Sequence, residues 1–194
     1  RTSQGVPAWV ERIVVVDDGS GDRTSERARG AGDARVEVLR HEKNRGVGAA
    51  IATGYAHAFA GGADVAVVMG ADAQMDPADL ERLVAPVLAG EAGYAKGDRL
   101  SHPACIGTMP WARLLGNIVL TALTRLSTGL CIRDSQCGYT ALAADAACAL
   151  DVASLWPRYG YPNDLLGRCA DAGIVVRDVV VRPIYSDEES GIRW

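Results

Sequence analysis

The segment Asp64-Val65-Ala66-Val67-Val68-Met69-Gly70-Ala71-Asp72-Ala73-Gln74-Met75-Asp76-Pro77 decides how the rest of the chain is interpreted. It predicts a short apolar strand that ends at Gly70 and is followed by the polar side chains of Asp72, Gln74 and Asp76. Open α/β sheets place ligand-binding groups at strand ends, because side chains there leave the core while the backbone stays rigid. We therefore expect the chemistry of the protein to be centred on this strand end.

Asp72 and Gln74 are two residues apart, so in an extended chain their side chains point to the same side. A carboxylate and a neutral carbonyl oxygen on one side suit a hard divalent cation that keeps several waters and also binds a diphosphate. A solvated loop is the open alternative for these two residues. Asp76 stands before Pro77, with Asp79 following shortly after, and this pattern predicts a helix cap.

Composition limits the class of protein. The chain has 194 residues and 48% hydrophobic content, which predicts one domain with a sizeable core over residues 1–194. A net charge of −4 argues against a nucleic-acid binder. The five cysteines form no Cys-x-x-Cys pair, which favours buried thiols in a reducing, cytoplasmic compartment. The apolar run 114–130 contains Asn117 and Arg125 and is a poor bilayer span.

Strand and helix patterns alternate along the chain, which predicts the α/β class. The segment 12–16 is apolar without alternation, as in a strand of a parallel sheet that is covered on both faces. The expected strands are 12–16, 35–40, 64–69, 93–96 and 174–182. The expected helices are 23–29, 80–88, 111–127, 165–171 and one that is opened by residues 44–48 and ended by Gly61-Gly62. We expect an irregular segment at 101–110, a loop at 134–139 that enters a strand, and a mobile polar tail from Tyr185.

Several of these segment ends carry groups that can bind a ligand, and in a parallel sheet they would share one edge. Asp17 and Asp18 could accept hydrogen bonds from a base or ribose. Arg45 could approach a nucleotide together with the backbone of Gly46 and Gly48, because glycine lets a ligand lie close to the chain. Each signal alone also fits an ordinary turn, a helix start or an exposed cation. The segment ends that carry such groups are Asp17/Asp18, Asp72/Gln74, Asp98/Arg99 and Asp134/Gln136.

The chain resembles the family 2 glycosyltransferases in three ordered segments: Val14-Val15-Val16-Asp17-Asp18-Gly19-Ser20, Asn44-Arg45-Gly46-x-Gly48 and Asp72-Ala73-Gln74-Met75-Asp76-Pro77. Three later segments are similar to the branch near dolichyl-phosphate mannose synthases and bacterial polyprenyl-phosphate sugar transferases: Lys96–Arg99, Asp134–Tyr139 and Tyr161–Leu165. The resemblance covers nearly the whole chain. It implies the GT-A nucleotide-sugar-binding fold, with a mostly parallel central sheet flanked by helices.

The resemblance also implies an inverting transfer of a hexose from a UDP- or GDP-linked sugar, with a polyprenyl phosphate as the favoured acceptor. Asp17 and Asp18 would hold the base and ribose of the donor. Asp72 would bind the Mg²⁺ or Mn²⁺ that bridges the diphosphate, with Gln74 beside it.

On the acceptor side, Arg99 and Arg113 fall where such enzymes place cations near the diphosphate and a phosphate acceptor. Asp134, Gln136 and Asp164 fall in the acceptor loops. A phosphate acceptor is already an anion and needs no base, whereas a hydroxyl acceptor would need a carboxylate, with Asp164 the first candidate and Asp134 the second. Two positions are open for the expected helix 111–127. It either contacts the inner face of a membrane peripherally or is buried in the core.

Two departures from the family pattern leave alternatives open. Gly70 stands where the family commonly has the first acid of Asp-x-Asp, which weakens the cation site or leaves it to Asp72, Gln74 and waters. No Pro-x-x-Asn-Glu-like segment precedes Arg12, which predicts a catalytic domain that lacks the first strand of the family. The alternatives are a nucleotide-sugar-binding protein without turnover and a nucleotidyltransferase, whose usual Gly-rich, basic phosphate loop is not found in the sequence.

Overall fold

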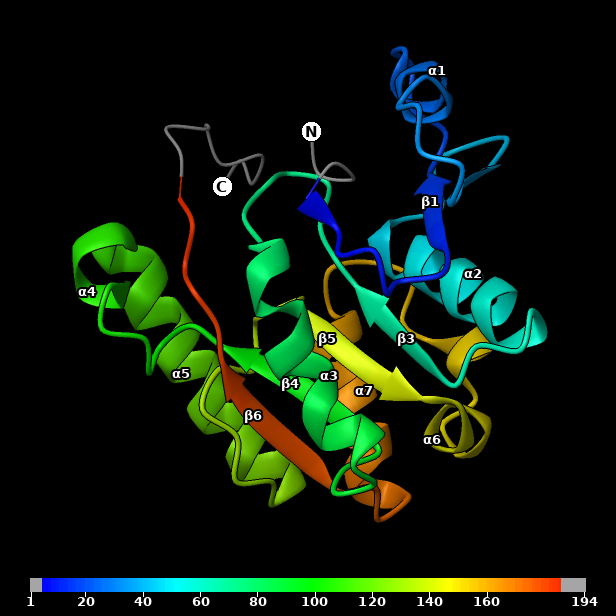
Figure 1. The fold of residues 1–194 in the computed structure, drawn as a ribbon. Helices are drawn as coiled ribbons and strands as arrows, with labels where there is room; N and C mark the ends of the chain where they lie inside the picture. Colours follow the sequence, from blue (N-terminus) through cyan, green and yellow to red (C-terminus); the bar gives the residue numbers. More distant parts are fainter. Residues whose placement is uncertain (1–4, 186–194) are drawn as a thin grey trace.

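A computed structural model describes residues 5–185, in which the apolar segments form strands and the amphipathic segments form helices around them (Figure 1). The strands are β1 (Ile13–Asp17), β2 (Val36–Arg40), β3 (Val65–Val68), β4 (Tyr94–Asp98), β5 (Thr140–Ala143) and β6 (Val176–Val180). The helices are α1 (Thr24–Arg29), α2 (Val47–Ala60), α3 (Leu80–Leu88), α4 (Cys105–Thr108), α5 (Trp111–Thr128), α6 (Ala144–Ala149) and α7 (Tyr161–Asp171). Two short 3₁₀ helices are η2 (Pro77–Asp79) and η3 (Val152–Ser154).

The strands form two sheets, a parallel pair β1-β2 and a four-stranded sheet in the order β3-β5-β4-β6. The expected α/β class with flanking helices is confirmed, but the pairing is more mixed than mostly parallel. β5 runs antiparallel to both β3 and β4, while β4 and β6 are parallel. The loop that leads into β5 is attached to the end of β4, since the Gly97 amide donates to the Tyr139 carbonyl at 2.8 Å. β5 therefore starts where β4 ends and runs back beside it.

Helices cover both faces of the four-stranded sheet (Figure 1). α3 packs on one face, where Leu83 shares a buried hydrophobic cluster with Ala95 and Ala141. The opposite face buries Tyr94 and Leu142 against α2, α6 and α7. The two faces alternate residue by residue along β4 and β5, as the period of a strand requires. β3, β4 and β6 point the same way, so their carboxyl ends and the start of β5 lie at one edge of the sheet.

The structure corrects the sequence expectation in three places. The segment 101–110 contains the short helix α4, and α6 follows β5 directly. α7 begins at Tyr161 rather than Leu165, because Pro162 occupies the first turn, where its missing amide hydrogen costs no hydrogen bond. The tail beyond Tyr185 lies outside the described residues. Among residues 5–185, no helix is long and apolar enough to cross a bilayer.

Candidate active site

The loop after β3 and the loop before β5 are joined at one edge of the sheet. The Tyr139 hydroxyl donates to the Asp76 carbonyl at 3.0 Å. Asp76 also caps η2 as predicted, because its Oδ1 accepts the Ala78 amide at 3.0 Å. With the attachment of β5 to β4, these contacts place five of the predicted residues at this edge. They are Asp72, Gln74, Arg99, Asp134 and Gln136.

Asp72 stands on a tight turn rather than in an extended segment. Its Oδ1 accepts the Gln74 amide at 3.0 Å, and Ala73 between them has a left-handed φ of 59°. Strand alternation therefore does not fix the two side chains on one side, contrary to the expectation from sequence. The Asp72 carboxylate is exposed and lies over Gly70, where an added Cβ would be 2.9 Å from its Oδ1.

The donor atoms at this turn fit a cation that arrives with a diphosphate. Within residues 5–185, no group of three His, Cys, Asp or Glu side chains could hold a metal ion. Asp72 offers a carboxylate and Gln74 an amide oxygen. Mg²⁺ is commonly held by one or two carboxylates, substrate phosphates and waters, so this small donor set is sufficient when phosphate oxygens complete the shell.

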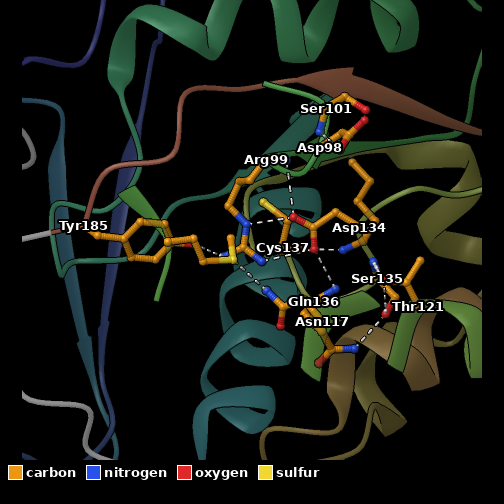
Figure 2. Close-up of polar contacts among 12 residues, drawn as sticks. Asp98, Arg99, Ser101, Asn117, Thr121, Asp134, Ser135, Gln136, Cys137 and Tyr185 are labelled. Carbon is orange, nitrogen blue, oxygen red and sulfur yellow. Dashed lines mark hydrogen bonds and ion pairs between the residues drawn. The ribbon is translucent and has the colours of Figure 1, made fainter. Parts of the chain in front are cut away.

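Arg99 and Asp134, predicted separately as a cation and an acceptor-side acid, form one ion pair in which Asp134 is fully buried and Arg99 partly so (Figure 2). Arg99 Nε donates to Asp134 Oδ2 at 2.8 Å, and Nη2 donates to Oδ1 at 3.1 Å. Burial would raise the pKa of Asp134, but the Arg99 guanidinium outweighs it and holds that pKa below its usual value. The pair remains charged and fixes the guanidinium in one plane.

Tyr185 lies between the two arginines that were predicted to bind phosphate. Arg99 Nη1 donates to the Tyr185 hydroxyl at 3.4 Å (Figure 2), and the Arg113 guanidinium lies 5.4 Å from the centre of the Tyr185 ring. The sequence assigned Tyr185 to a polar tail and gave no signal for this contact. The arrangement gathers two cations around one aromatic ring.

A polar network attaches the loop after Asp134 to α5 and α7. The Ser135 amide donates to Thr121 Oγ1 at 3.0 Å, and Gln136 Nε2 donates to Asn163 Oδ1 at 3.2 Å. Thr124 Oγ1 donates to the same Asn163 oxygen at 3.1 Å. Gln136 is thus a fixed part of the acceptor-side loop, and Asn163 is a neighbour that sequence reasoning missed.

Three ionisable residues lie close to one another on β4 and β6: Lys96, Asp98 and Asp178. Lys96 is fully buried and donates from Nζ to the Cys137 carbonyl, and burial lowers its pKa. Asp98 is also fully buried, and its Oδ2 has no hydrogen-bond partner among the described residues. Burial and the charge of Asp98 raise the pKa of Asp178 to about 6. Asp98 was among the predicted strand-end groups, whereas Asp178 was missed, although a charged residue inside a strand was the available signal for it.

Asp178→Asn is expected to stabilise the protein at alkaline pH. The raised pKa means that the folded protein favours the protonated form, so wild-type stability falls as pH rises from about 4 through 6. Removing the charge should raise the unfolding free energy by about 1–2 kcal/mol at pH 8. The asparagine oxygen can still accept the Arg133 amide, which now donates to Oδ2 at 2.8 Å. Urea unfolding of the variant and the wild type at pH 8 and pH 4 tests this prediction. An equal increase in the unfolding free energy at both pH values would contradict it.

Asp17 and Asp18 form a second group at the end of β1. Asp17 is buried, and hydrogen bonds from Ser25 and Ser20 lower its pKa to about 2. Asp18 Oδ1 accepts the Arg45 amide at 2.9 Å and Oδ2 accepts the Gly46 amide at 2.7 Å. Both carboxylates therefore shape the loops in which the donor-binding residues were predicted.

His41 supports this second group and was missed by sequence reasoning. It is buried, with Nδ1 2.7 Å from Asp18 Oδ1 and Nε2 3.0 Å from Thr53 Oγ1. The ring therefore connects the end of β1 to α2. Its position immediately after β2 was the available signal, because that residue also lies at a strand end.

The close approach that Gly46 and Gly48 allow is made by the backbone of the chain itself. The Ala49 amide donates to the Pro157 carbonyl at 3.1 Å. A methyl group at position 48 would lie 3.0 Å from the Pro157 carbonyl carbon and closer still to the Trp156 carbonyl oxygen. The donor-binding role of both glycines stays a prediction.

Gly48→Ala is expected to lower the free energy of unfolding by about 1–3 kcal/mol, because the new methyl group must displace backbone rather than a flexible side chain. Gly54→Ala in the same helix is the matched control, since its Cβ would meet only a Val16 methyl at 3.5 Å. The control should be neutral or stabilise by up to about 1 kcal/mol. Denaturant unfolding of both variants checks the difference, and equal stabilities would contradict it.

Asp164 supports the segment before α7. Its Oδ2 accepts the Trp156 amide at 2.8 Å and Arg168 Nε at 3.1 Å. In the described part of the chain, no hydrogen bond or ion pair joins Asp164, or the Asp17–Asp18 group, to the Arg99–Asp134 pair. The structure thus brings the Asp72 turn, the Arg99–Asp134 pair and Gln136 to one edge, where Tyr185 connects Arg113 to Arg99. It holds Asp17, Asp18 and Asp164 in separate local networks.

Comparisons with known proteins identify the class. The model of the family described as "Glycosyl transferase family 2" matches residues 9–147. UDP-N-acetylglucosamine–dolichyl-phosphate N-acetylglucosaminyltransferase of Methanococcus voltae is 29% identical over 91% of this chain and 76% of its own. Undecaprenyl-phosphate mannosyltransferase of Micrococcus luteus is 30% identical over 87% of this chain and 70% of its own.

A solved structure supports the same fold. Glucosyl-3-phosphoglycerate synthase from Mycobacterium tuberculosis, in complex with Mn²⁺, UDP and phosphoglyceric acid, superposes with a TM-score of 0.71 at 23% identity. The match covers 96% of this chain, which spans 64% of the length of that synthase. The fold is therefore that of GT-A glycosyltransferases.

The chain belongs to glycosyltransferase family 2, and it is a glycosyltransferase. This result decides against the nucleotidyltransferase and the binder without turnover that the sequence left open.

Proposed function

We propose that this glycosyltransferase moves a hexose, with inversion, from a UDP- or GDP-linked sugar to a polyprenyl phosphate. The observation that carries the proposal is the shared sheet edge of the Asp72 turn and the Arg99–Asp134 ion pair. The Asp72 turn presents an exposed carboxylate, and the Arg99–Asp134 pair presents a guanidinium held in a fixed orientation. The named acceptors of the Methanococcus and Micrococcus relatives support a lipid phosphate.

Each residue has a distinct role in the proposed reaction. An acceptor phosphate oxygen attacks the anomeric carbon from the face opposite the donor diphosphate, and the bond from that carbon to the diphosphate oxygen breaks. Arg99 stabilises the negative charge that grows on the diphosphate, and Asp134 keeps the guanidinium oriented. Arg113 binds the acceptor phosphate beside Tyr185. No base is required, so Asp164 would act only on a hydroxyl acceptor.

A divalent cation at Asp72 and Gln74, either Mg²⁺ or Mn²⁺, would supply Lewis-acid stabilisation of the departing diphosphate. Asp17, Asp18, Arg45, Gly46 and Gly48 form the donor side in this proposal. Asp18 acts there mainly by holding the Arg45–Gly46 backbone in place. A lipid acceptor would place the enzyme on the cytoplasmic, inner face of a membrane.

The proposal is tested by incubating the protein with UDP-glucose, UDP-N-acetylglucosamine or GDP-mannose, with Mn²⁺ or Mg²⁺ and with undecaprenyl phosphate in detergent. Nucleoside diphosphate release and lipid-linked sugar are measured together. We expect one donor to give both products in equal amounts, and only when the lipid phosphate is present. A parallel reaction contains 3-phosphoglycerate instead of the lipid. Transfer to that soluble acceptor alone would overturn the assignment of the acceptor.

A further inference from the structure

The amphipathic helix α5 is oriented with its polar face toward the protein. Its buried side chains are Asn117, Thr121 and Thr124. Its large apolar side chains are exposed, with 78% of Trp111 and 85% of Leu126 accessible to solvent. This result excludes the buried core helix that the sequence left as an alternative. The other exposed apolar residues of α5 are Leu115, Ile118, Val119, Leu120 and Leu123.

The inward polar face of α5 has a structural reason. Thr121 and Thr124 bond to the network that includes Ser135 and Asn163, which holds the loop carrying Asp134. The outward apolar face has no such explanation within the described residues. Exposed apolar patches of this kind mark interaction surfaces.

The charges of α5 and of the segments that flank it in the sequence indicate what covers the face. Residues 99–133 contain four arginines and no acidic residue, although the whole chain carries a net charge of −4. At about 100° per residue, Arg113 and Arg125 lie on opposite margins of the apolar stripe of α5. A second copy of the chain packed on this face would bring arginines toward arginines. An apolar stripe with cationic margins instead suits a surface with an apolar interior and anionic headgroups.

We infer that the exposed face of α5 docks on an anionic lipid bilayer, with the helix lying in the plane of the interface. The inference extends the proposed function and rests on it in one respect, since the acceptor is taken to lie in that bilayer. Docking on this face places the Tyr185–Arg113 contact at the lipid headgroups. A shallow hollow lined by Leu120, Leu123, Leu126 and Asn163 connects the apolar face to the acceptor-loop network.

The test is co-sedimentation of the protein with vesicles of phosphatidylcholine alone or with about a third phosphatidylglycerol. The vesicles contain neither acceptor nor donor, so docking is measured without turnover. We expect binding to the anionic vesicles that weakens with salt. Leu123→Gln/Leu126→Gln should weaken partitioning at least about tenfold, and Arg125→Gln about fivefold.

Matched control variants distinguish docking through α5 from nonspecific adsorption to vesicles. Leu88 at the end of α3 is 66% exposed, so Leu88→Gln tests an exposed leucine outside the docking face. Arg29→Gln in α1 does the same for an exposed arginine. Both should bind anionic vesicles like the wild type, and circular dichroism should show the wild-type fold for all variants.

Three results would overturn the inference. They are equal binding to neutral and anionic vesicles, wild-type binding by Leu123→Gln/Leu126→Gln, and a lipid-free dimer that this double variant dissociates. The last result would assign the face to a second copy. Failure of the proposed function looks different, because vesicle binding would then persist while lipid-dependent diphosphate release is missing.

Discussion

Asp72→Asn is expected to reduce metal-dependent release of nucleoside diphosphate by about 10²–10³-fold, the loss typical of one group that stabilises a developing oxyanion. The physical reason is the loss of the carboxylate charge that the Asp72 turn presents to the cation. Asparagine retains the size and the oxygen that accepts the Gln74 amide, so the turn should persist. The measurement is kcat across a titration of Mn²⁺, in which the variant should need more metal and reach a lower plateau.

Asp76→Asn is the matched control for that substitution. Asp76 is four residues away and its side chain caps η2 by accepting the Ala78 amide at 3.0 Å. Asparagine caps a helix about as well as aspartate, so turnover should stay within about twofold of wild type. If Asp72→Asn keeps the wild-type metal dependence, the cation has been assigned to the wrong residue.

Asp134→Asn is expected to lower the free energy of unfolding by about 3–5 kcal/mol, because it leaves the largely buried Arg99 guanidinium without a counter-charge. Asp134 is fully buried and accepts from both Nε and Nη2 of Arg99. An amide nitrogen in its place would face another donor. The measurement is urea unfolding at pH 7 followed by tryptophan fluorescence.

Acid pH and a surface ion pair provide the controls for Asp134. The pKa of Asp134 is lowered in the folded protein, so its contribution is present at neutral pH and is lost as the pH falls through that pKa. The difference between the variant and the wild type should therefore shrink under acid conditions. Glu26→Gln breaks an exposed pair with Arg23 and should change stability by no more than about 0.5 kcal/mol. If Asp134→Asn also changes the free energy of unfolding by only about 0.5 kcal/mol, the Arg99–Asp134 pair does not stabilise the fold as proposed.

The local parts of this fold could be predicted from the sequence. The apolar runs of β1 and β3 and the acids after them follow from strand patterning, and the cap at Asp76 follows from turn chemistry. The start of α7 could not be predicted, because Tyr161 and Pro162 are compatible with either a loop or a first helical turn. The course of β5 depended on the attachment of its loop to β4, which involves residues far apart in the chain.

The sequence by itself determined the family, the α/β class and which chemical groups stand at the strand ends, because these depend on residues close together in the chain. Only the tertiary structure decided which groups meet. It joined Arg99 to Asp134 across 35 residues and committed Asp164 to the Trp156 amide and Arg168. It also turned the polar face of α5 inward, because Thr121 and Thr124 found partners on other elements. Contacts between residues so far apart in the sequence depend on how the whole chain packs, so they cannot be predicted from local sequence patterns.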